Sequence, residues 1–346
     1  MESLQVPKSF KTLQLSENKL DIVQENIVES SEPQLVLKPR LVGICRSDIK
    51  EFLGTRTVRH DFGHEILAKV VESNINDDQV PKVGNLVVLD PHIKIQRTSG
   101  FGELIVATGS NENLTKAFIK VSPSISEDKL VFTEPLACAH HCVSNLLRYE
   151  QRKTLDGLSV GIVGAGMTGA LIGLICKHLG AAVTIINRSE DRLSFLKNTS
   201  VYNTSELSLK DEVEQGFDVV IPTTTFLFSD VLQFCENIVK DSGLILLYGG
   251  TKAGDAFPEH KEIDIDSIRR SQSLIEVSSD GKRFRIGGTH GAVTEDFLSV
   301  GKLLKDYPQD FPVDNLISNR IKLTDVPETI IKMTEKEIFG KTLVEF

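Results

Sequence analysis

The pattern of hydrophobic and polar residues divides the chain into parts in which the apolar residues recur at different spacings. Up to about residue 145, apolar runs of three to six residues alternate with turns rich in Gly, Pro, Asn and Asp. Short runs of this kind predict strands, and their regular spacing is typical of a β-barrel or a β-sandwich. A helix is expected to begin near Glu134 and to run to the end of this part. The clearest strand candidates are residues 35–37, 66–71, 86–89 and 104–106.

The next part, residues 155–250, alternates strand-like and helical runs. This order predicts a doubly wound parallel sheet. A helix and a strand are expected within residues 265–290, and an amphipathic helix from Thr294 to about residue 305. The tail resembles the first part in chemistry, so the chain is expected to return there. We therefore predict an α/β protein with domains at 1–146 and 147–288 and a C-terminal return at 289–346.

A glycine-rich turn follows the strand-like run at residues 160–163 and has the spacing Gly164-x-Gly166-x-x-Gly169. A helical run and a second strand-like run come next, which is the order of a dinucleotide-binding unit. The glycines allow a tight turn, close approach of pyrophosphate to the backbone, and close packing of helix on strand. The alternative is a buried glycine-rich turn without a ligand. The predicted cofactor contacts here are Gly164, Gly166, Met167, Thr168 and Gly169.

The end of the second strand-like run bears on the choice of cofactor. An NAD enzyme normally carries Asp or Glu there to bind the ribose hydroxyls, but this chain has Asn187-Arg188-Ser189. No carboxylate occupies this position to repel a 2′-phosphate, and the guanidinium of Arg188 suits one. The sequence therefore favours NADP(H) over NAD(H). The alternative is NAD(H), with Arg188 a surface charge.

Composition and charge narrow the class of protein. The chain has 346 residues and a net charge of −9 without basic blocks, which argues against nucleic-acid binding. Its five cysteines are scattered and form no CxxC, which suits a reducing compartment. Residues 158–176 are uncharged, but their glycines and phosphate-binding turn indicate a buried strand and helix rather than a membrane span. No secretory signal is visible, so we expect a soluble cytoplasmic protein.

Three further residues could hold a metal ion. Cys45, His64 and Glu134 offer a thiolate, an imidazole and a carboxylate, the ligand types of a catalytic zinc site with an open fourth position. Each has an alternative role, as a small core residue, a structural histidine or a helix start. Spacing alone does not decide between these interpretations.

A resemblance supports the metal site. The motifs GICRSD (43–48), GHE (63–65), EPLACA (134–139) and GAGMTG (164–169) are together similar to the zinc-containing medium-chain dehydrogenase/reductase family. The resemblance covers essentially the whole chain in the expected order. It implies a GroES-like β domain, a Rossmann domain, a C-terminal return, and an active site in the cleft between the domains.

The resemblance also implies roles for individual residues. Cys45, His64 and Glu134 match the zinc ligands of the polyol and glucose branches, and Glu65 matches a carboxylate that approaches the metal during turnover. Ser47 matches the hydroxyl that hydrogen-bonds the substrate oxygen and starts the proton relay. Asp48 matches a carboxylate that orients the ligating histidine, and Arg46 matches a contact to the cofactor phosphate. Lys50 stands where other members of the family have a relay histidine.

The chain departs from the family pattern in three places. Residues 91–103 lack the four cysteines of the structural zinc lobe, so one catalytic zinc and no structural zinc is expected. Only 18 residues separate Cys45 from His64, so the substrate-facing loop is compact. Two spare histidines follow Glu134, and each is more often solvated or packed than a ligand. The loop residues that could enter the pocket are Arg56, Arg59 and His60, and the spare histidines are His140 and His141.

The expected reaction is the interconversion of an alcohol and its carbonyl compound, with polyols or sugars favoured. Thr223 and Gly249, at later strand ends, are expected to border the nicotinamide. The alternatives are a zinc-free enone or quinone reductase of the same fold and a non-catalytic nucleotide-binding protein. A phosphorylated or amino sugar is a further possible substrate, with Lys282 and Arg283 among the basic residues that could bind a phosphate. A homo-oligomer, dimer or tetramer, is expected, with the strand at 284–288 or its neighbour as the pairing edge.

Overall fold

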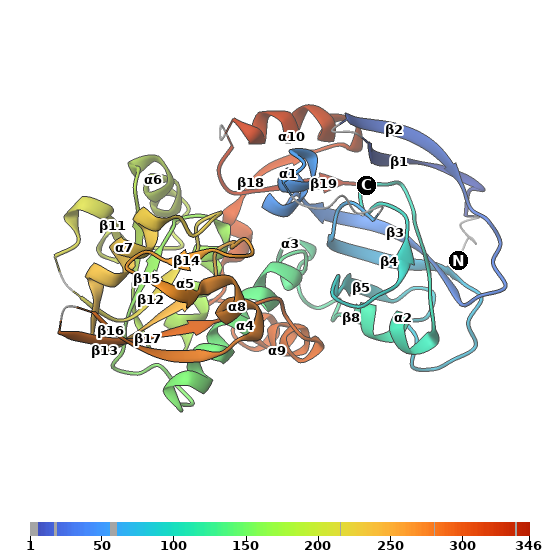
Figure 1. Cartoon of the computed structure of the whole chain (residues 1–346). Helices are drawn as coiled ribbons and strands as arrows, with labels where there is room; N and C mark the ends of the chain where they lie inside the picture. Colours follow the sequence, from blue (N-terminus) through green and yellow to red (C-terminus); the bar gives the residue numbers. More distant parts are fainter. Residues whose placement is uncertain (1–5, 17–18, 56–60, 215, 280, 336–337) are drawn as a thin grey trace. The chain divides into compact units, whose positions relative to one another are not determined.

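The computed structural model describes residues 6–346 except 17–18, 56–60, 215, 280 and 336–337. The chain forms two compact units (Figure 1). The first unit comprises Met1–Glu134, Phe297–Pro308 and Ile317–Phe346, and the second comprises Pro135–Asp296 and Gln309–Leu316. Two of the four boundaries fall inside helices, α4 (Thr133–Glu150) and α9 (Thr294–Asp306).

The first unit is built around strand β3 (Gln34–Gly43), which pairs antiparallel with β4 (Glu65–Ser73), β7 (Ile105–Thr108) and β19 (Lys341–Glu345). Three partners for one strand bring the C-terminal strand beside the strands of the N-terminal half. The other strands are β1 (Ser9–Ser16), β2 (Lys19–Asn26), β5 (Leu86–Leu89), β6 (Gln96–Arg97), β8 (Phe118–Lys120) and β18 (Ile317–Ile321). The helices are α1 (Arg46–Phe52), α2 (Asn111–Ala117), α3 (Glu127–Leu130) and α10 (Val326–Thr334), with a short η4 (Leu323–Asp325).

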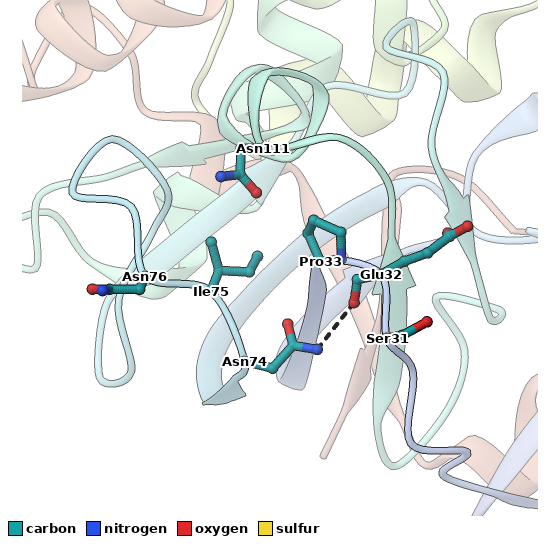
Figure 2. A pocket seen from close by; sticks show the side chains of 7 residues that line it. All are labelled: Ser31, Glu32, Pro33, Asn74, Ile75, Asn76 and Asn111. Carbon is teal, nitrogen blue, oxygen red and sulfur yellow. Dashed lines mark hydrogen bonds between the residues drawn. The ribbon is translucent and has the colours of Figure 1, made fainter.

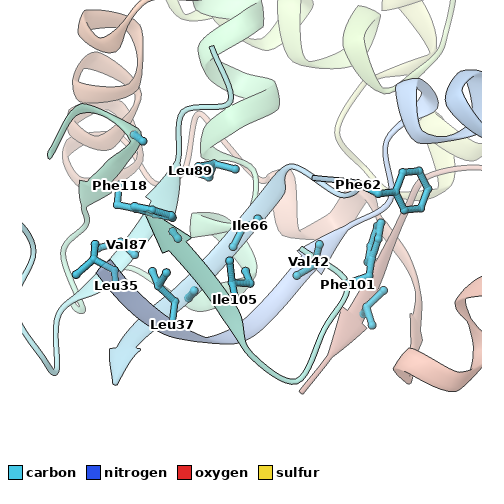
Figure 3. Close-up of a cluster of buried hydrophobic side chains, with 14 of the residues drawn as sticks. Leu35, Leu37, Val42, Phe62, Ile66, Val87, Leu89, Phe101, Ile105 and Phe118 are labelled. Atoms are coloured by element: carbon cyan, nitrogen blue, oxygen red, sulfur yellow. The ribbon is translucent and has the colours of Figure 1, made fainter. Parts of the chain in front are cut away.

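The core of the first unit lies along these strands (Figure 3). Apolar side chains such as Leu35 and Leu37 on β3 are fully buried, as the strand pattern predicts. The C-terminal strand adds Val344 to the same cluster. Burial of this apolar surface is the main force that holds the C-terminal return against the N-terminal strands.

The second unit contains a seven-stranded sheet in the order β11-β10-β9-β12-β13-β17-β16. Six strands are parallel, and β16 pairs antiparallel with β17. This is the doubly wound order of a dinucleotide-binding fold with one antiparallel strand added at its edge. The strands are β9 (Ser159–Val163), β10 (Ala182–Asn187), β11 (Leu207–Leu209), β12 (Phe217–Pro222), β13 (Val239–Leu247), β16 (Leu274–Ser279) and β17 (Lys282–Gly288).

Helices connect the parallel strands, and a small antiparallel pair lies outside the main sheet. The predicted α/β class, with a GroES-like β unit and a Rossmann unit, is confirmed. The sequence patterns missed strand β16 and the pair β14–β15, which are short segments with few consecutive apolar residues. The helices of the second unit are α5 (Met167–His178), α6 (Glu190–Asn198), α7 (Ser229–Ile238) and α8 (Ile265–Ser271), with the short η1 (Thr204–Glu206), η2 (Lys210–Glu212) and η3 (Val313–Leu316). The small antiparallel pair consists of β14 (Ala256–Phe257) and β15 (His260–Asp264).

Within the described part of the chain, no helix is both long and apolar enough to cross a bilayer.

Candidate active site

Cys45 and His64 are brought together by the pairing of β3 with β4. The register places Gly43, the last residue of β3, opposite Glu65, the first residue of β4. Cys45 follows Gly43 by two positions and His64 precedes Glu65, so both lie at the same end of the paired strands. The ligand atoms of Cys45, His64 and Glu65 all lie within 4.8 Å of one another. Among the described residues, this is the one group of three or more such side chains close enough to share a metal ion.

Asp48 contacts two of the three predicted ligands, Cys45 and His64. Cys45 is the N-cap of α1, and its backbone N–H donates to Asp48 Oδ2 at 2.8 Å. Asp48 Oδ1 lies 3.3 Å from His64 Nδ1, and the carboxylate is buried. A carboxylate on Nδ1 selects the tautomer with the lone pair on Nε2 and fixes the plane of the ring. The position of Asp48 therefore prepares His64 to bind a metal through Nε2.

The electrostatic environment of His64 suits a cation. Burial lowers the pKa of His64, but the negative charges of Asp48 and Cys45 and their hydrogen bonds raise it well above its usual range. Ser47 Oγ lies 3.3 Å from His64 Nε2, on the side where a metal ion or a substrate would bind. A proton or a metal ion at Nε2 would be stabilised by the same two anionic neighbours.

Glu65 forms a buried ion pair that the sequence did not reveal. Lys341 Nζ donates to Glu65 Oε1 at 2.7 Å and also contacts Oε2, and both side chains are buried. Burial lowers the pKa of Lys341, but the charges of Glu65 and Cys45 raise it above its usual value. Residue 343, two positions beyond Lys341 on β19, pairs with Gly43. In the sequence, Lys341 is marked only by its place at the start of an apolar strand, which does not indicate a buried ion pair.

Gly43 leaves the space through which this pair passes. A Cβ atom at position 43 would collide with the carboxylate of Glu65. Strand β3 lies between β4 and β19, so the Lys341 and Glu65 side chains meet across a strand that lacks a side chain at this point. The glycine is thus required by a close approach rather than by its backbone dihedral angles.

Glu134 lies in the first turn of α4 and is buried. Burial raises the pKa of Glu134, the charges of His64, His92 and Lys341 lower it, and that of Glu65 raises it, with a net increase. These neighbours place Glu134 in the same electrostatic environment as the cluster. The Glu134 carboxylate is not part of the group whose ligand atoms lie within 4.8 Å of one another. The carboxylate in that group is that of Glu65. His92, which the sequence analysis did not single out, is an additional nearby imidazole.

The donors at this site fit a zinc ion. A thiolate, an imidazole oriented through its other nitrogen, and buried carboxylates are the ligand types of catalytic zinc sites. All of these residues belong to the first unit. The arrangement could hold a divalent cation with one position left for an exchangeable ligand.

Other predicted residues of the first unit have different surroundings. Arg46 Nη1 donates to the backbone carbonyl of Met333 at 3.0 Å, which ties α1 to α10. Lys50 lies in the last turn of α1. The loop residues Arg56, Arg59 and His60 lie outside the described residues.

His140 and His141 belong to the second unit and share one carboxylate. His140 Nδ1 lies 2.6 Å from Asp296 Oδ1, and His141 Nδ1 lies 2.8 Å from Asp296 Oδ2. His141 Nε2 also lies 2.8 Å from Gln272 Oε1. These contacts connect α4 to the first turn of α9 and to the end of α8.

The glycine turn of the second unit has the shape that a phosphate site requires. Gly164 has φ +124°, which favours glycine, and Gly166 is the N-cap of α5. A Cβ atom at Gly169 would collide with the carbonyl of Gly164, so the helix and the strand approach closely only with glycine there. Met167 and Thr168 form the first turn of α5, where backbone N–H groups have no partner within the helix.

Side chains from neighbouring strands hold this turn. The hydroxyl of Thr223 donates to the carbonyl of Gly164 at 3.0 Å. Asn187 Oδ1 accepts from the N–H of Ala165 at 3.2 Å, and its Nδ2 donates to the carbonyl of Ser189 at 2.8 Å. Asn187 thus connects the turn to the end of β10, a role that its position in the sequence did not show.

The other predicted cofactor and phosphate contacts differ in exposure. Arg188 and Ser189 are exposed just beyond β10. Gly249 donates its N–H to the carbonyl of Pro222 at 2.9 Å, next to the end of β12. Lys282 Nζ donates to the carbonyl of Glu236. Arg283 lies beside it on β17.

A separate pocket lies in the first unit (Figure 2). Asn74 donates to the carbonyls of Ser30 and Glu32 at 3.0 Å and thereby shapes its polar wall. The pocket shares no lining residue with the Cys45–His64–Glu65 cluster, so we assign it no part in the chemistry. Its lining residues are Ser31, Glu32, Pro33, Asn74, Ile75, Asn76 and Asn111.

Comparisons with known proteins were made with the sequence and with the fold. No protein-family model matches the chain. An uncharacterised zinc-type alcohol dehydrogenase-like protein of Haemophilus influenzae is 27% identical over 282 residues, which cover 73% of this chain and 80% of the relative. The D-arabitol-phosphate dehydrogenase of Enterococcus avium is 22% identical over 358 residues, covering 92% of each chain.

The fold is also that of a solved dehydrogenase. The crystal structure of 2R,3R-butanediol dehydrogenase from Bacillus subtilis matches 97% of this chain and 99% of its own, with a TM-score of 0.73 and 19% identity. At this identity the likeness shows the fold alone.

Proposed function

We propose that the chain is a zinc-type member of the medium-chain dehydrogenase/reductase family and that it interconverts an alcohol and its carbonyl compound with one zinc ion and NADP(H). The observation that carries the proposal is the cluster of Cys45, His64 and Glu65, with His64 oriented by Asp48. The same chain carries a dinucleotide turn of the required shape. An alcohol-dehydrogenase type of oxidoreductase uses both features.

We assign the zinc ligands to Cys45, His64 and Glu134. Lys341 already balances the charge of Glu65, so Glu65 is better suited to stay close to the metal than to bind it permanently. Zinc held here would supply a Lewis acid for the substrate oxygen, and the nicotinamide would accept or donate the hydride. Ser47 would hydrogen-bond the substrate hydroxyl and take its proton. Asp48 would keep the lone pair of His64 directed toward the metal.

The cofactor is assigned from the end of β10. The side chain of Asn187 holds the glycine turn, which leaves the exposed Arg188 and Ser189 to meet the adenosine ribose. A guanidinium and a hydroxyl suit a 2′-phosphate, and this strand end carries no carboxylate to repel one. Thr223 and Gly249 are assigned to the border of the nicotinamide site.

The proposed substrates are polyols, sugars or related hydroxy compounds. Buried carboxylate ligands match the polyol and glucose branches that the motifs resemble, and one relative is named for a phosphorylated polyol. The test is a panel of simple alcohols, polyols, aldoses and their phosphates, assayed with NADP⁺ and with NAD⁺ at fixed enzyme concentration. Turnover of a polyol or sugar with NADP⁺ is expected. Turnover confined to enones or quinones, insensitive to chelators, would favour a zinc-free reductase instead.

A homo-oligomer is proposed as the assembled form. The predicted pairing strand, β17, is interior to the sheet, and its neighbour β16 is the edge strand. An exposed edge strand pairs readily with another chain. Light scattering on the purified protein is expected to give the mass of a dimer or a tetramer, and a monomer at micromolar concentration would contradict the proposal.

A further inference from the structure

We infer that residues 97–101, named here the 97–101 segment, are a positioning device for the metal ligand His64. The inference rests on the proposed zinc site. The segment lies within residues 91–103, where the sequence lacks the four cysteines of a structural zinc lobe. In the structure this stretch instead binds the backbone that leads into His64.

Arg97 supplies two of the contacts. Its Nη2 donates to the carbonyls of Asp61 and Gly63 at 2.6 and 2.7 Å, and it lies 3.5 Å from the Asp61 carboxylate. The Arg97 side chain is only 2% exposed. A buried guanidinium is stable only when its donors are satisfied, and its planar fork can reach two carbonyls at once. Arg97 therefore fixes the peptide plane that joins residue 61 to residue 62 and the one that joins residue 63 to His64.

The carbonyl between those two is held as well. The hydroxyl of Ser99 donates to the carbonyl of Phe62 at 2.9 Å, and the N–H of Gly100 donates to it at 2.7 Å. All three carbonyls of residues 61–63 thus accept hydrogen bonds from the 97–101 segment. His64 is the next residue in the chain, so this backbone sets its Cα position and the direction of its Cα–Cβ bond.

Packing makes the same connection. The rings of Phe62 and Phe101 lie side by side with centroids 5.4 Å apart (Figure 3). Gly63 has φ +76°, and a Cβ atom there would collide with the ring of Phe101. A Cβ atom at Gly100 would likewise collide with the carbonyl of Gly63. The two stretches are therefore in close contact through backbone and rings as well as through the side chains of Arg97 and Ser99.

The segment is itself anchored to the unit. The N–H of Leu13 on β1 donates to the carbonyl of Phe101 at 2.8 Å. Thr12 forms a bridge with Gly102. The chain of contacts runs from β1 through the 97–101 segment to residues 61–63 and ends at His64. Outer contacts of this kind typically change metal affinity by about 10- to 100-fold when they are removed.

The test compares Arg97→Met and Arg97→Lys with the wild-type protein. Zinc affinity is measured by competition with a chromogenic chelator, and Co²⁺-loaded protein is examined by absorption, which reports the geometry of the thiolate and imidazole ligands. Arg97→Met is expected to bind zinc about 10- to 100-fold more weakly and to shift the cobalt bands. Arg97→Lys, which keeps the charge and one donor, is expected to recover part of the affinity. Wild-type affinity and an unchanged cobalt spectrum in Arg97→Met would overturn the inference.

Two further variants keep the result interpretable. Arg285→Met removes a partly buried guanidinium of the second unit that is paired with Glu150. It is expected to lower the melting temperature without changing zinc affinity. If Arg97→Met does not fold, Ser99→Ala removes one donor to the Phe62 carbonyl and is expected to weaken zinc binding several-fold. Unchanged affinity in Ser99→Ala would then overturn the inference.

The wild-type measurement separates this inference from the proposed function. Absence of zinc and cobalt binding by the wild-type protein contradicts the proposed zinc site. Metal binding by the wild type with equal affinity in the variants contradicts only the role of the 97–101 segment.

Discussion

Lys341 Nζ lies 2.7 Å from Glu65 Oε1, although 276 positions separate the two residues in the sequence. The side chain of Lys341 is 5% exposed and that of Glu65 is 1% exposed, so hydration stabilises neither charge strongly. The pair joins the C-terminal strand to the first residue of β4, beside His64. It therefore combines a structural role with the placement of a carboxylate next to the proposed metal.

Lys341→Met is expected to be strongly destabilising because it leaves the Glu65 carboxylate buried without a counter-charge. Breaking a buried ion pair from one side typically costs about 3–5 kcal/mol. Urea unfolding of the metal-free protein would measure this loss. The double variant Lys341→Met with Glu65→Gln is expected to recover much of it, and equal stability of the single and double variants would contradict the explanation.

Asp48→Asn tests how His64 is oriented. An asparagine can still accept from the Cys45 N–H, but its amide N–H₂ would then face His64 Nδ1. The imidazole would have to carry its proton on Nε2, the nitrogen assigned to the metal. Zinc affinity is expected to fall by about 10- to 100-fold with little change in the free energy of unfolding. Chelator competition beside urea unfolding checks both quantities, and unchanged zinc affinity would contradict the orientation.

Arg188→Ala tests the cofactor assignment. Loss of a charge-assisted contact to a phosphate costs about 1.5–3 kcal/mol, which is roughly 10- to 100-fold in kcat/KM for NADPH. The value for NADH is expected to stay nearly constant because NADH lacks the 2′-phosphate. Initial rates with both cofactors measure the ratio, and an equal loss for NADH would contradict the assignment.

Asn187→Asp provides a matched change at the neighbouring position. The aspartate can still accept from the Ala165 N–H, which keeps the contact with the glycine turn, although it loses the donation to the Ser189 carbonyl. Its negative charge should repel the 2′-phosphate and favour NADH. Asn187→Ala, which loses the acceptor, is expected to weaken binding of both cofactors. Fluorescence titration with NADPH and NADH separates these outcomes.

Much of this arrangement could be predicted from the sequence, because its signals are local. The turn at Gly164, Gly166 and Gly169 and the alternating strands carry their pattern within a few dozen residues. The contact of Lys341 with Glu65 and that of Arg97 with residues 61–63 join distant segments, and no local pattern marks them. Strand β16 was missed because half of its side chains are exposed and its apolar run is short.

His141 in the second unit is expected to make the stability of the protein depend on pH. The hydrogen bond with Asp296 raises the pKa of His141, burial opposes it, and the net shift is upward. The folded protein thus keeps this proton to higher pH than the unfolded chain. Its stabilising contribution is complete below the unfolded pKa of about 6.5 and is lost as pH rises through the folded value.

His141→Gln removes this titration. Melting temperatures of the wild type and the variant, measured from pH 5.5 to pH 9, are expected to differ most at the acidic end and to converge toward the alkaline end. Burial raises the pKa of Asp296, but hydrogen bonds from His140 and His141 lower it strongly, so its own contribution is lost only in strong acid. A constant difference across the range would contradict the assignment to His141.

The zinc content of the purified protein, measured by mass spectrometry beside that of Cys45→Ser, tests the central claim most directly. The serine variant keeps the size of the side chain and the N-cap position but replaces the thiolate with a poor zinc ligand. We predict close to one zinc per chain in the wild type and a small fraction of that in the variant, with loss of NADP⁺-dependent alcohol oxidation in parallel. Equal zinc content in the two proteins, or full activity in the variant, would contradict the account.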